Sequence, residues 1–446
     1  MDEFFPYLKA LERLIHPFKG KPEDYQHVLN DIGDARFVLI GEASHGTHEF
    51  YQIRAELTRY LIQEKGFNAI AIEGDWPDAY TLHSYVQGKS SLESSFEALK
   101  DFKRFPAWMW RNEMILNFVA WLKLYNDSIS NENDKIGFYG LDIYSLHSSI
   151  NAVLDHLEKI NPEAARHARK RYSCFEAFGT DPEVYAYETA LGIKGDCEQE
   201  AQEQFIELQS QAIKKMKAKD SQEFLYILQN TKIVKDAEMY YRTLFSGNRN
   251  FSWNLRDKHM AETIDLLSVY YDQLLGHSSK FIIWAHNSHI GDTRATEMKA
   301  QGEYNLGQLM REKYGSQTFL LGFTTYEGTV TAASELGGIT ERKRVRPALP
   351  DSIESIFYHV PSPQFFLSFR SNDRNLEELG EKLLLHRAIG VIYRPETERY
   401  SHYFHSNITQ QYDAILHLDH TTALIPLELA AEKPREEFPE TFPSGL

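Results

Sequence analysis

Residues 37–49 read Phe37-Val38-Leu39-Ile40-Gly41-Glu42-Ala43-Ser44-His45-Gly46-Thr47-His48-Glu49. The four apolar residues at the start are typical of a short buried β-strand. The chain then turns at Gly41 and presents Glu42, Ser44 and His45 before a helix begins near residue 49. A carboxylate and an imidazole at the end of a buried strand lose hydration, so they need polar partners or a chemical role. The alternative is a turn whose polar residues only cap the helix.

The following residues complete a β-α-β unit. A helix is predicted from about residue 49 to residue 65, with Arg54 one position off its apolar stripe. Gly66 is expected to end this helix in the left-handed conformation that glycine adopts easily. A second apolar strand, at residues 67–72, then ends in Glu73. Two strands joined by a helix are parallel, with a right-handed crossover.

Later strands also end in polar residues. The strand predicted at residues 136–141 ends in Asp142, and the strand at 281–285 leads into His286 and His289. Ligands of open parallel sheets lie beyond the carboxyl ends of the strands. We therefore predict that one crevice is faced by Glu42, His45, Glu73, Asp142, His286 and His289. Three further strands are expected, at 319–323, 388–393 and 414–416.

The length of 446 residues predicts more than one domain. We expect an α/β fold with a three-layer α/β/α core around a mainly parallel sheet, a helical insertion domain and a smaller α+β part. The predicted parts are a first core segment at 1–147, a helical insertion at 148–247, a second core segment at 248–325, an α+β segment or lid at 326–387, C-terminal core strands at 388–430 and a flexible tail at 431–446.

Composition excludes several classes of partner. The chain carries 64 acidic and 48 basic residues, a formal charge of −16, which disfavours nucleic acid and anionic membrane surfaces. Neither a signal peptide nor an apolar run of membrane-spanning length is seen, so a soluble cytoplasmic protein is expected. The two cysteines, Cys174 and Cys197, indicate neither a disulfide framework nor a zinc site.

Three chemistries fit the polar cluster. Ser44 as a nucleophile is disfavoured, because two residues rather than one separate it from Gly41 and the adjacent His45 rarely points back at a serine. A metal such as zinc or iron would find ligands in Glu42, His45, Glu73, His286 and His289, although no His-Glu-x-x-His motif is present. The third chemistry is activation of water by a histidine that a carboxylate orients, with arginine or histidine donors for the oxyanion.

Four motifs together closely resemble the erythromycin esterase family. They are Gly41-Glu42-Ala43-Ser44-His45-Gly46-Thr47, Glu73 at the end of its strand, Asn254-Leu255-Arg256-Asp257-Lys258-His259-Met260-Ala261 and Trp284-Ala285-His286-Asn287-Ser288-His289-Ile290. The motifs occur in the family's order over nearly the whole chain. The family is broad and includes proteins labelled for succinoglycan biosynthesis.

The resemblance implies an esterase-like hydrolase of macrolide lactones or other small-molecule esters that needs no metal or other cofactor. It implies that His45 activates water and that Glu42 and Glu73 orient the base and the water. His286 and His289 would complete the site. Arg54, Arg256, Asp142 and Ser44 would support it or contact substrate. The alternatives are a metal-dependent hydrolase using the same residues and a sugar- or metabolite-binding protein related to polysaccharide biosynthesis.

Overall fold

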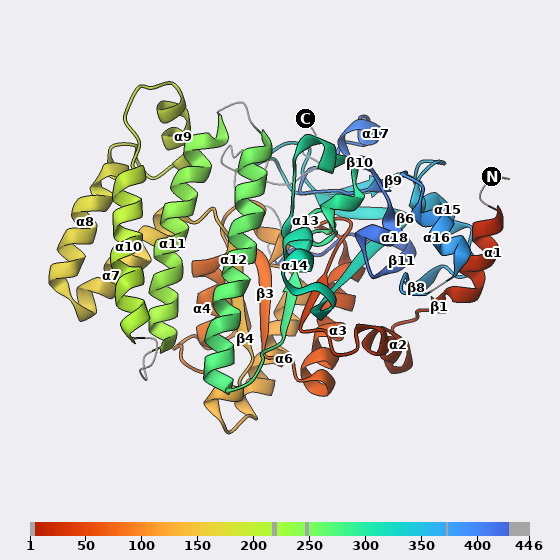
Figure 1. The fold of residues 1–446 in the computed structure, drawn as a ribbon, viewed down its shortest axis with the longest axis horizontal. Helices are drawn as coiled ribbons and strands as arrows, with labels where there is room; N and C mark the ends of the chain where they lie inside the picture. The colour runs from red at the N-terminus through yellow and green to blue at the C-terminus, as the bar shows by residue number, and fades with distance from the viewer. Residues whose placement is uncertain (1–4, 216–220, 246–248, 372, 428–446) are drawn as a thin grey trace. The chain divides into compact units, whose positions relative to one another are not determined.

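The computed structural model describes residues 5–215, 221–245, 249–371 and 373–427. It confirms the α/β class: a large, mostly parallel sheet is combined with many helices (Figure 1). The strand order is β1-β8-β11-β6-β2-β5-β3-β4, and β7 pairs with β6. The strands are β1 (His16–Pro17), β2 (Phe37–Ile40), β3 (Ala69–Asp75), β4 (Gly137–Asp142), β5 (Phe281–Trp284), β6 (Thr318–Ala332), β7 (Glu341–Val345), β8 (Gln364–Ser368) and β11 (Ala414–Thr421).

The contacts of the chain divide it into two compact units. The first comprises Met1–Ala71, Ser84–Gly137 and Leu275–Leu446, and the second comprises Ile72–His83 and Phe138–Leu274. The division cuts β3 and β4, so the chain passes between the units within these strands. The domain boundaries predicted from the sequence stay a prediction.

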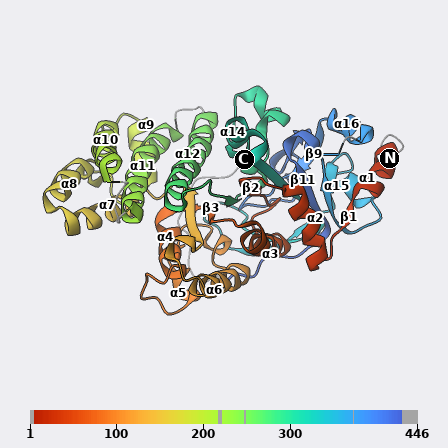
Figure 2. The same cartoon turned by 60° about the horizontal axis from the view of Figure 1, so that its bottom comes forward.

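The first unit is built around β2. This strand is fully buried and runs parallel to β5 on one side and to β6 on the other. In Figure 2, α3 and α14 lie on opposite sides of β2. The helices of this unit are α1 (Phe5–Leu14), α2 (Pro22–Ile32), α3 (His48–Lys65), α5 (Ser95–Ala98), α6 (Glu113–Asp127), α13 (Asn287–Ile290), α14 (Leu306–Tyr314), α15 (Ile353–Tyr358), α16 (Arg374–Gly380), α17 (Glu398–Ser401) and α18 (Ile408–Gln411).

Helix α3 agrees closely with the sequence prediction. It ends at Gly66, whose φ of 68° and ψ of 37° are left-handed, as expected. The strand predicted at 388–393 is wrong, however. The strand there is β9 (Leu384–Arg387), which pairs with β10 (Tyr403–Ser406) in a separate two-stranded sheet. Residues 388–393 form only two isolated bridges, of Ile389 with Ser44 and of Ile392 with Ala333, because these partners lie beyond the ends of β2 and β6.

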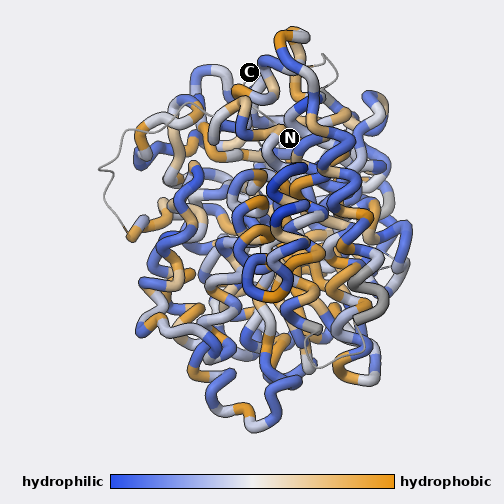
Figure 3. Tube along the Cα trace, turned by 90° about the vertical axis from the view of Figure 1, so that its left-hand side faces the viewer, coloured by the Kyte–Doolittle hydropathy of each residue, from blue (hydrophilic) through white to orange (hydrophobic). Residues whose placement is uncertain are grey.

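The second unit is mainly helical. Its helices are α7 (Leu146–Ile160), α8 (Pro162–Glu176), α9 (Pro182–Ala190), α10 (Glu198–Lys215), α11 (Ser221–Leu244) and α12 (Arg249–Leu275), and α4 (Trp76–Val86) begins in it. Figure 3 shows hydrophobic and hydrophilic residues interspersed along these helices, as in amphipathic helices that bury one face. The described residues contain no helix long and apolar enough to cross a membrane.

The prediction about the cysteines is wrong. Cys174, in α8, and Cys197, just before α10, form a disulfide with a Cα–Cα distance of 5.8 Å. Two cysteines 23 residues apart give little sequence signal for a bond. The packing of α8 against α10 brings them together. The predicted tail at 431–446 lies outside the described residues.

Candidate active site

His45 and Glu42 form a buried pair directly after β2. Nδ1 of His45 lies 2.9 Å from Oε1 of Glu42, and neither side chain is more than 1% exposed. A carboxylate can only accept a hydrogen bond, so Nδ1 carries the proton. In the neutral imidazole Nε2 of His45 then holds a lone pair, and it has no hydrogen-bond partner among the described residues. An imidazole in this state can accept a proton from water.

The turn that carries this pair requires glycine at both ends. A Cβ at Gly41 would overlap Oδ1 of Asn287, and a Cβ at Gly46 would overlap the carbonyl oxygen of Thr331 in β6. The amide of Asn287 cannot easily move, because it donates to the carbonyl of Phe323 at 2.7 Å and accepts from the N–H of Phe323 at 3.2 Å. The two glycines thus allow close packing of the turn against α13 at Gly41 and against β6 at Gly46.

Arg54 holds the second oxygen of the Glu42 carboxylate. Nη2 of Arg54, in α3, donates to Oε2 of Glu42 at 2.9 Å, and the arginine side chain is fully buried. The sequence placed Arg54 just off the apolar stripe, and aromatic rings explain its burial. Its Cζ lies 4.3 Å from the ring centre of Tyr51 and 5.2 Å from that of Trp284. Nε and Nη1 of Arg54 have no acceptor among the described residues.

His286 packs against His45 and has a defined tautomer. The ring centroids of the two histidines are 4.7 Å apart. Nε2 of His286 lies 3.2 Å from the carbonyl oxygen of Ile389, so Nε2 is the donor. Nδ1 of His286 accepts from the N–H of Ser288 at 3.3 Å and lies 2.8 Å from its hydroxyl. These contacts fit a neutral imidazole, which places no positive charge beside His45.

His289 and Ser44 also lie in the first unit. His289 is fully buried in α13, where its N–H donates to the carbonyl of His286 at 2.9 Å. The hydroxyl of Ser44 forms a hydrogen bond with the hydroxyl of Thr47. Ser44 thus bonds to a neighbouring threonine and not to an imidazole that could act as its base.

A second charged cluster lies in the second unit. Arg256, in α12, donates through Nε and Nη2 to both oxygens of Asp142 at 2.7 and 2.8 Å, and through Nη2 to Glu73 at 2.9 Å. All three side chains are at most 3% exposed. Burial disfavours the charged guanidinium, but Asp142, Tyr144 and Glu73 outweigh it and raise the pKa of Arg256 well above its usual value.

The predicted site residues thus form two groups. Glu42, His45, Arg54, His286, His289 and Ser44 belong to the first unit, and Glu73, Asp142 and Arg256 belong to the second. Within each group the carboxylates and cations that the sequence singled out are in contact. The convergence of both groups on one crevice stays a prediction.

Ile389 was missed as a member of the site. Its carbonyl fixes His286, and it also accepts from the N–H of His45 at 3.3 Å. No sequence signal could have found this role, because any residue provides a backbone carbonyl. Among the described residues, no three His, Cys, Asp or Glu side chains are grouped so that they could hold a metal ion.

The fold is of the α/β class, and a buried histidine–carboxylate pair follows its strand β2. A family model described as Erythromycin esterase matches residues 62–421, so the chain belongs to the erythromycin esterase family. The matched residues include Glu73, Arg256 and His286 and begin after Glu42 and His45. Membership of this family supports a hydrolase.

Three relatives illustrate the similarity. Erythromycin esterase type II of Escherichia coli is 23% identical over 401 residues, which cover 85% of this chain and 90% of that protein. The crystal structure of a succinoglycan biosynthesis protein has a TM-score of 0.77 at 24% identity and covers 96% of this chain and 100% of that one. A mutant of the erythromycin esterase EreC in its open conformation has a TM-score of 0.68 at 17% identity, covering 93% and 98%.

Proposed function

We propose that this protein hydrolyses an ester or lactone bond of a small molecule, using a water that His45 activates. The observation that carries the proposal is the state of His45. Its Nδ1 is held by Glu42, while its Nε2 has no partner among the described residues. Nε2 would take a proton from water as the water oxygen bonds to the acyl carbon. The proton would then pass to the leaving alcohol oxygen as the ester C–O bond breaks.

Two features of the first unit support this chemistry. The carboxylate of Glu42 is neutralised by Arg54 on one oxygen and orients His45 with the other. Arg54 also keeps Nε and Nη1 without an acceptor among the described residues. Such buried donors suit the negative charge that develops on the carbonyl oxygen. His286 offers no free donor when its Nε2 is bonded to Ile389.

The substrate class follows from the relatives. Two of them are named erythromycin esterases, which makes macrolide lactones the first compounds to test. The succinoglycan label of another relative adds acylated sugars. A metal-dependent reaction at the same residues and binding without turnover are the competing proposals.

The test is a hydrolysis screen of macrolides, simple esters and acylated sugars, with the purified protein and its His45→Gln variant. We expect hydrolysis of at least one class by the wild type, at least ~100-fold slower hydrolysis by the variant, and one oxygen from ¹⁸O-labelled water in the acid product. Equal rates for the two proteins would overturn the assignment of His45. Loss of activity on chelation, restored by an added metal, would favour the metal-dependent reaction. A covalent acyl adduct that Ser44→Ala abolishes would favour the serine.

A further inference from the structure

Ile389 connects the two histidines of the first unit. Its carbonyl oxygen accepts from the N–H of His45 at 3.3 Å and from Nε2 of His286 at 3.2 Å. Its own N–H donates to the carbonyl of Ala43 at 2.8 Å. One backbone carbonyl therefore contacts both the turn that bears His45 and the ring of His286, whose Nδ1 is held by Ser288.

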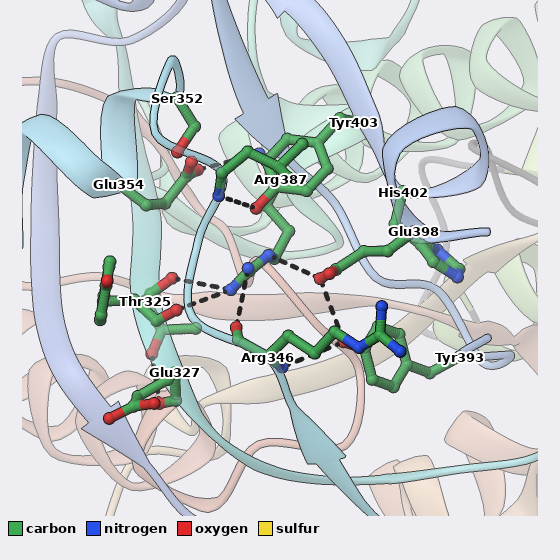
Figure 4. A network of polar contacts seen from close by, with 12 residues as sticks. Thr325, Glu327, Arg346, Ser352, Glu354, Arg387, Tyr393, Glu398, His402 and Tyr403 are labelled. Carbon is green, nitrogen blue, oxygen red and sulfur yellow. Dashed lines mark hydrogen bonds and ion pairs between the residues drawn. The ribbon is translucent and has the colours of Figure 1, made fainter. Parts of the chain in front are cut away.

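Arg387 lies two residues before this carbonyl and is almost fully buried. Figure 4 shows its polar contacts. Its Nη1 donates to the carbonyl of Tyr326 at 2.9 Å and to that of Thr325 at 3.4 Å. Its Nη2 donates to the carbonyl of Arg346 at 2.9 Å. These three carbonyls belong to β6 and to the segment that follows β7, so Arg387 joins two separate parts of the chain to the segment that bears Ile389.

Carboxylates complete the network around Arg387. Oε1 of Glu398 lies 3.1 Å from Nε of Arg387 and accepts from the hydroxyl of Tyr393 at 3.0 Å. Oε1 of Glu354 accepts from the N–H of Arg387 at 2.9 Å and lies 2.8 Å from Nδ1 of His386. Arg387 and Tyr393, which bracket Ile389, are thereby tied to one charged network.

A buried ion pair alone is a weak reason to keep an arginine, since an apolar side chain often stabilises a core equally well. The planar guanidinium, however, can bind several carbonyls at once in a fixed geometry, and the compact ammonium of lysine cannot. We propose that Arg387 is a positioning residue for the hydrolysis proposed above, on which this inference rests. It holds the Ile389 carbonyl where that oxygen fixes the His286 ring and the His45 turn.

The test uses the full-length protein with Arg387→Lys, which keeps the positive charge and loses the planar guanidinium. The first readout is ¹⁵N NMR of the histidine rings, which needs no substrate. We expect the wild-type His286 to carry its proton on Nε2, and the variant to show a mixture of tautomers. The second readout is kcat, which we expect to fall on the order of tenfold to a hundredfold with KM little changed, because a small displacement of catalytic groups is costly. The pH profile of kcat should shift as well.

The control is Arg311→Lys, which disrupts another arginine of the same unit, bonded to both oxygens of Asp413 at 3.2 and 2.5 Å. It should leave the tautomer of His286 and kcat as in the wild type. If Arg387→Lys does not fold, Tyr393→Phe removes the hydroxyl bonded to Glu398 and is measured in the same way. A folded variant with the wild-type tautomer and kcat would overturn the inference. Should the wild type hydrolyse no ester, the proposed function fails, and the NMR comparison alone decides whether Arg387 fixes His286.

Discussion

Oε1 of Glu42 lies 2.9 Å from Nδ1 of His45, and Arg54 occupies the other oxygen of the same carboxylate. The imidazole is therefore oriented by a partner that is itself fixed. Replacing His45 with Gln should remove the base and lower kcat/KM by about 10²–10⁴-fold. Circular dichroism should show an unchanged fold. A folded variant with near wild-type kcat/KM would contradict the role of His45.

Removing the charge of Glu42 should affect both stability and activity. Glu42→Gln leaves the guanidinium of Arg54 buried without a counter-charge, so we expect a loss of about 3–5 kcal/mol in unfolding free energy by urea titration. We also expect kcat to fall by about 10²-fold or more, because the imidazolium is no longer stabilised. Glu49→Gln is the control, since this carboxylate binds Thr422 near the surface. Comparable losses in both variants would argue against a special role for Glu42.

Arg256 should be essential for the stability of the second unit. Arg256→Met strips Asp142 and Glu73 of their shared cation, and two buried carboxylates then repel each other. We expect a loss of at least about 3–5 kcal/mol in urea unfolding. Arg256→Lys should lose less, because the charge remains while the paired bonds do not. A Met variant as stable as the wild type would show that the cluster is not needed for folding.

Acid should destabilise the protein partly through His402. Burial, followed by the charge of Arg387, lowers the pKa of His402 from 6.5 to about 4. Below pH 6.5, His402 binds a proton in the unfolded chain, whereas in the folded chain it does so only near pH 4. The contribution of His402 to the free energy of unfolding is therefore fully present above pH 6.5 and declines as the pH falls to about 4. The total is roughly 3 kcal/mol, at about 1.4 kcal/mol per pKa unit.

The check is urea unfolding of the wild type and His402→Gln at a series of pH values from 7 to 4. Glutamine does not titrate, and its amide oxygen can accept the N–H of Arg394 that Nε2 of His402 accepts now. The variant should lose less stability over this interval. Parallel curves for the two proteins would exclude His402 as a source of the pH dependence.

The disulfide should stabilise the second unit. Its closed loop of about 24 residues corresponds to roughly 3 kcal/mol of unfolded-state entropy. We expect Cys174→Ser with Cys197→Ser, or treatment with a thiol reductant, to lower the unfolding free energy by about that amount. Alkylation under native, non-reducing conditions should find no free thiol. Disulfides are rare in reducing compartments such as the cytoplasm. A bond found by this experiment would therefore count against the predicted cytoplasmic location.

The sequence predicted those contacts of the site that join residues close together in the chain. Glu42 and His45 are three residues apart on one turn, so the local pattern was enough to pair them, whereas Arg54 was assigned to the site through the family resemblance. Asp142 and Arg256 were recognised separately, but nothing in the sequence indicated that they bond to each other. Ile389 was placed in a strand because its neighbours are apolar. Its actual role depends on a backbone atom and on contacts with turns far away in the chain, which periodicity does not encode.

The bond between the N–H of His45 and the carbonyl of Ile389 has a consequence for synthesis on the ribosome. The chain must be translated to residue 389 before this contact can form, and β11, which lies between β6 and β8 in the large sheet, follows only at 414–421. Contacts of such long sequence separation form late and slowly. A nascent chain truncated before residue 389 would carry His45 and Glu42 and lack the carbonyl that fixes their turn. Catalytic competence should therefore appear only after residue 389 has been translated and has left the ribosome.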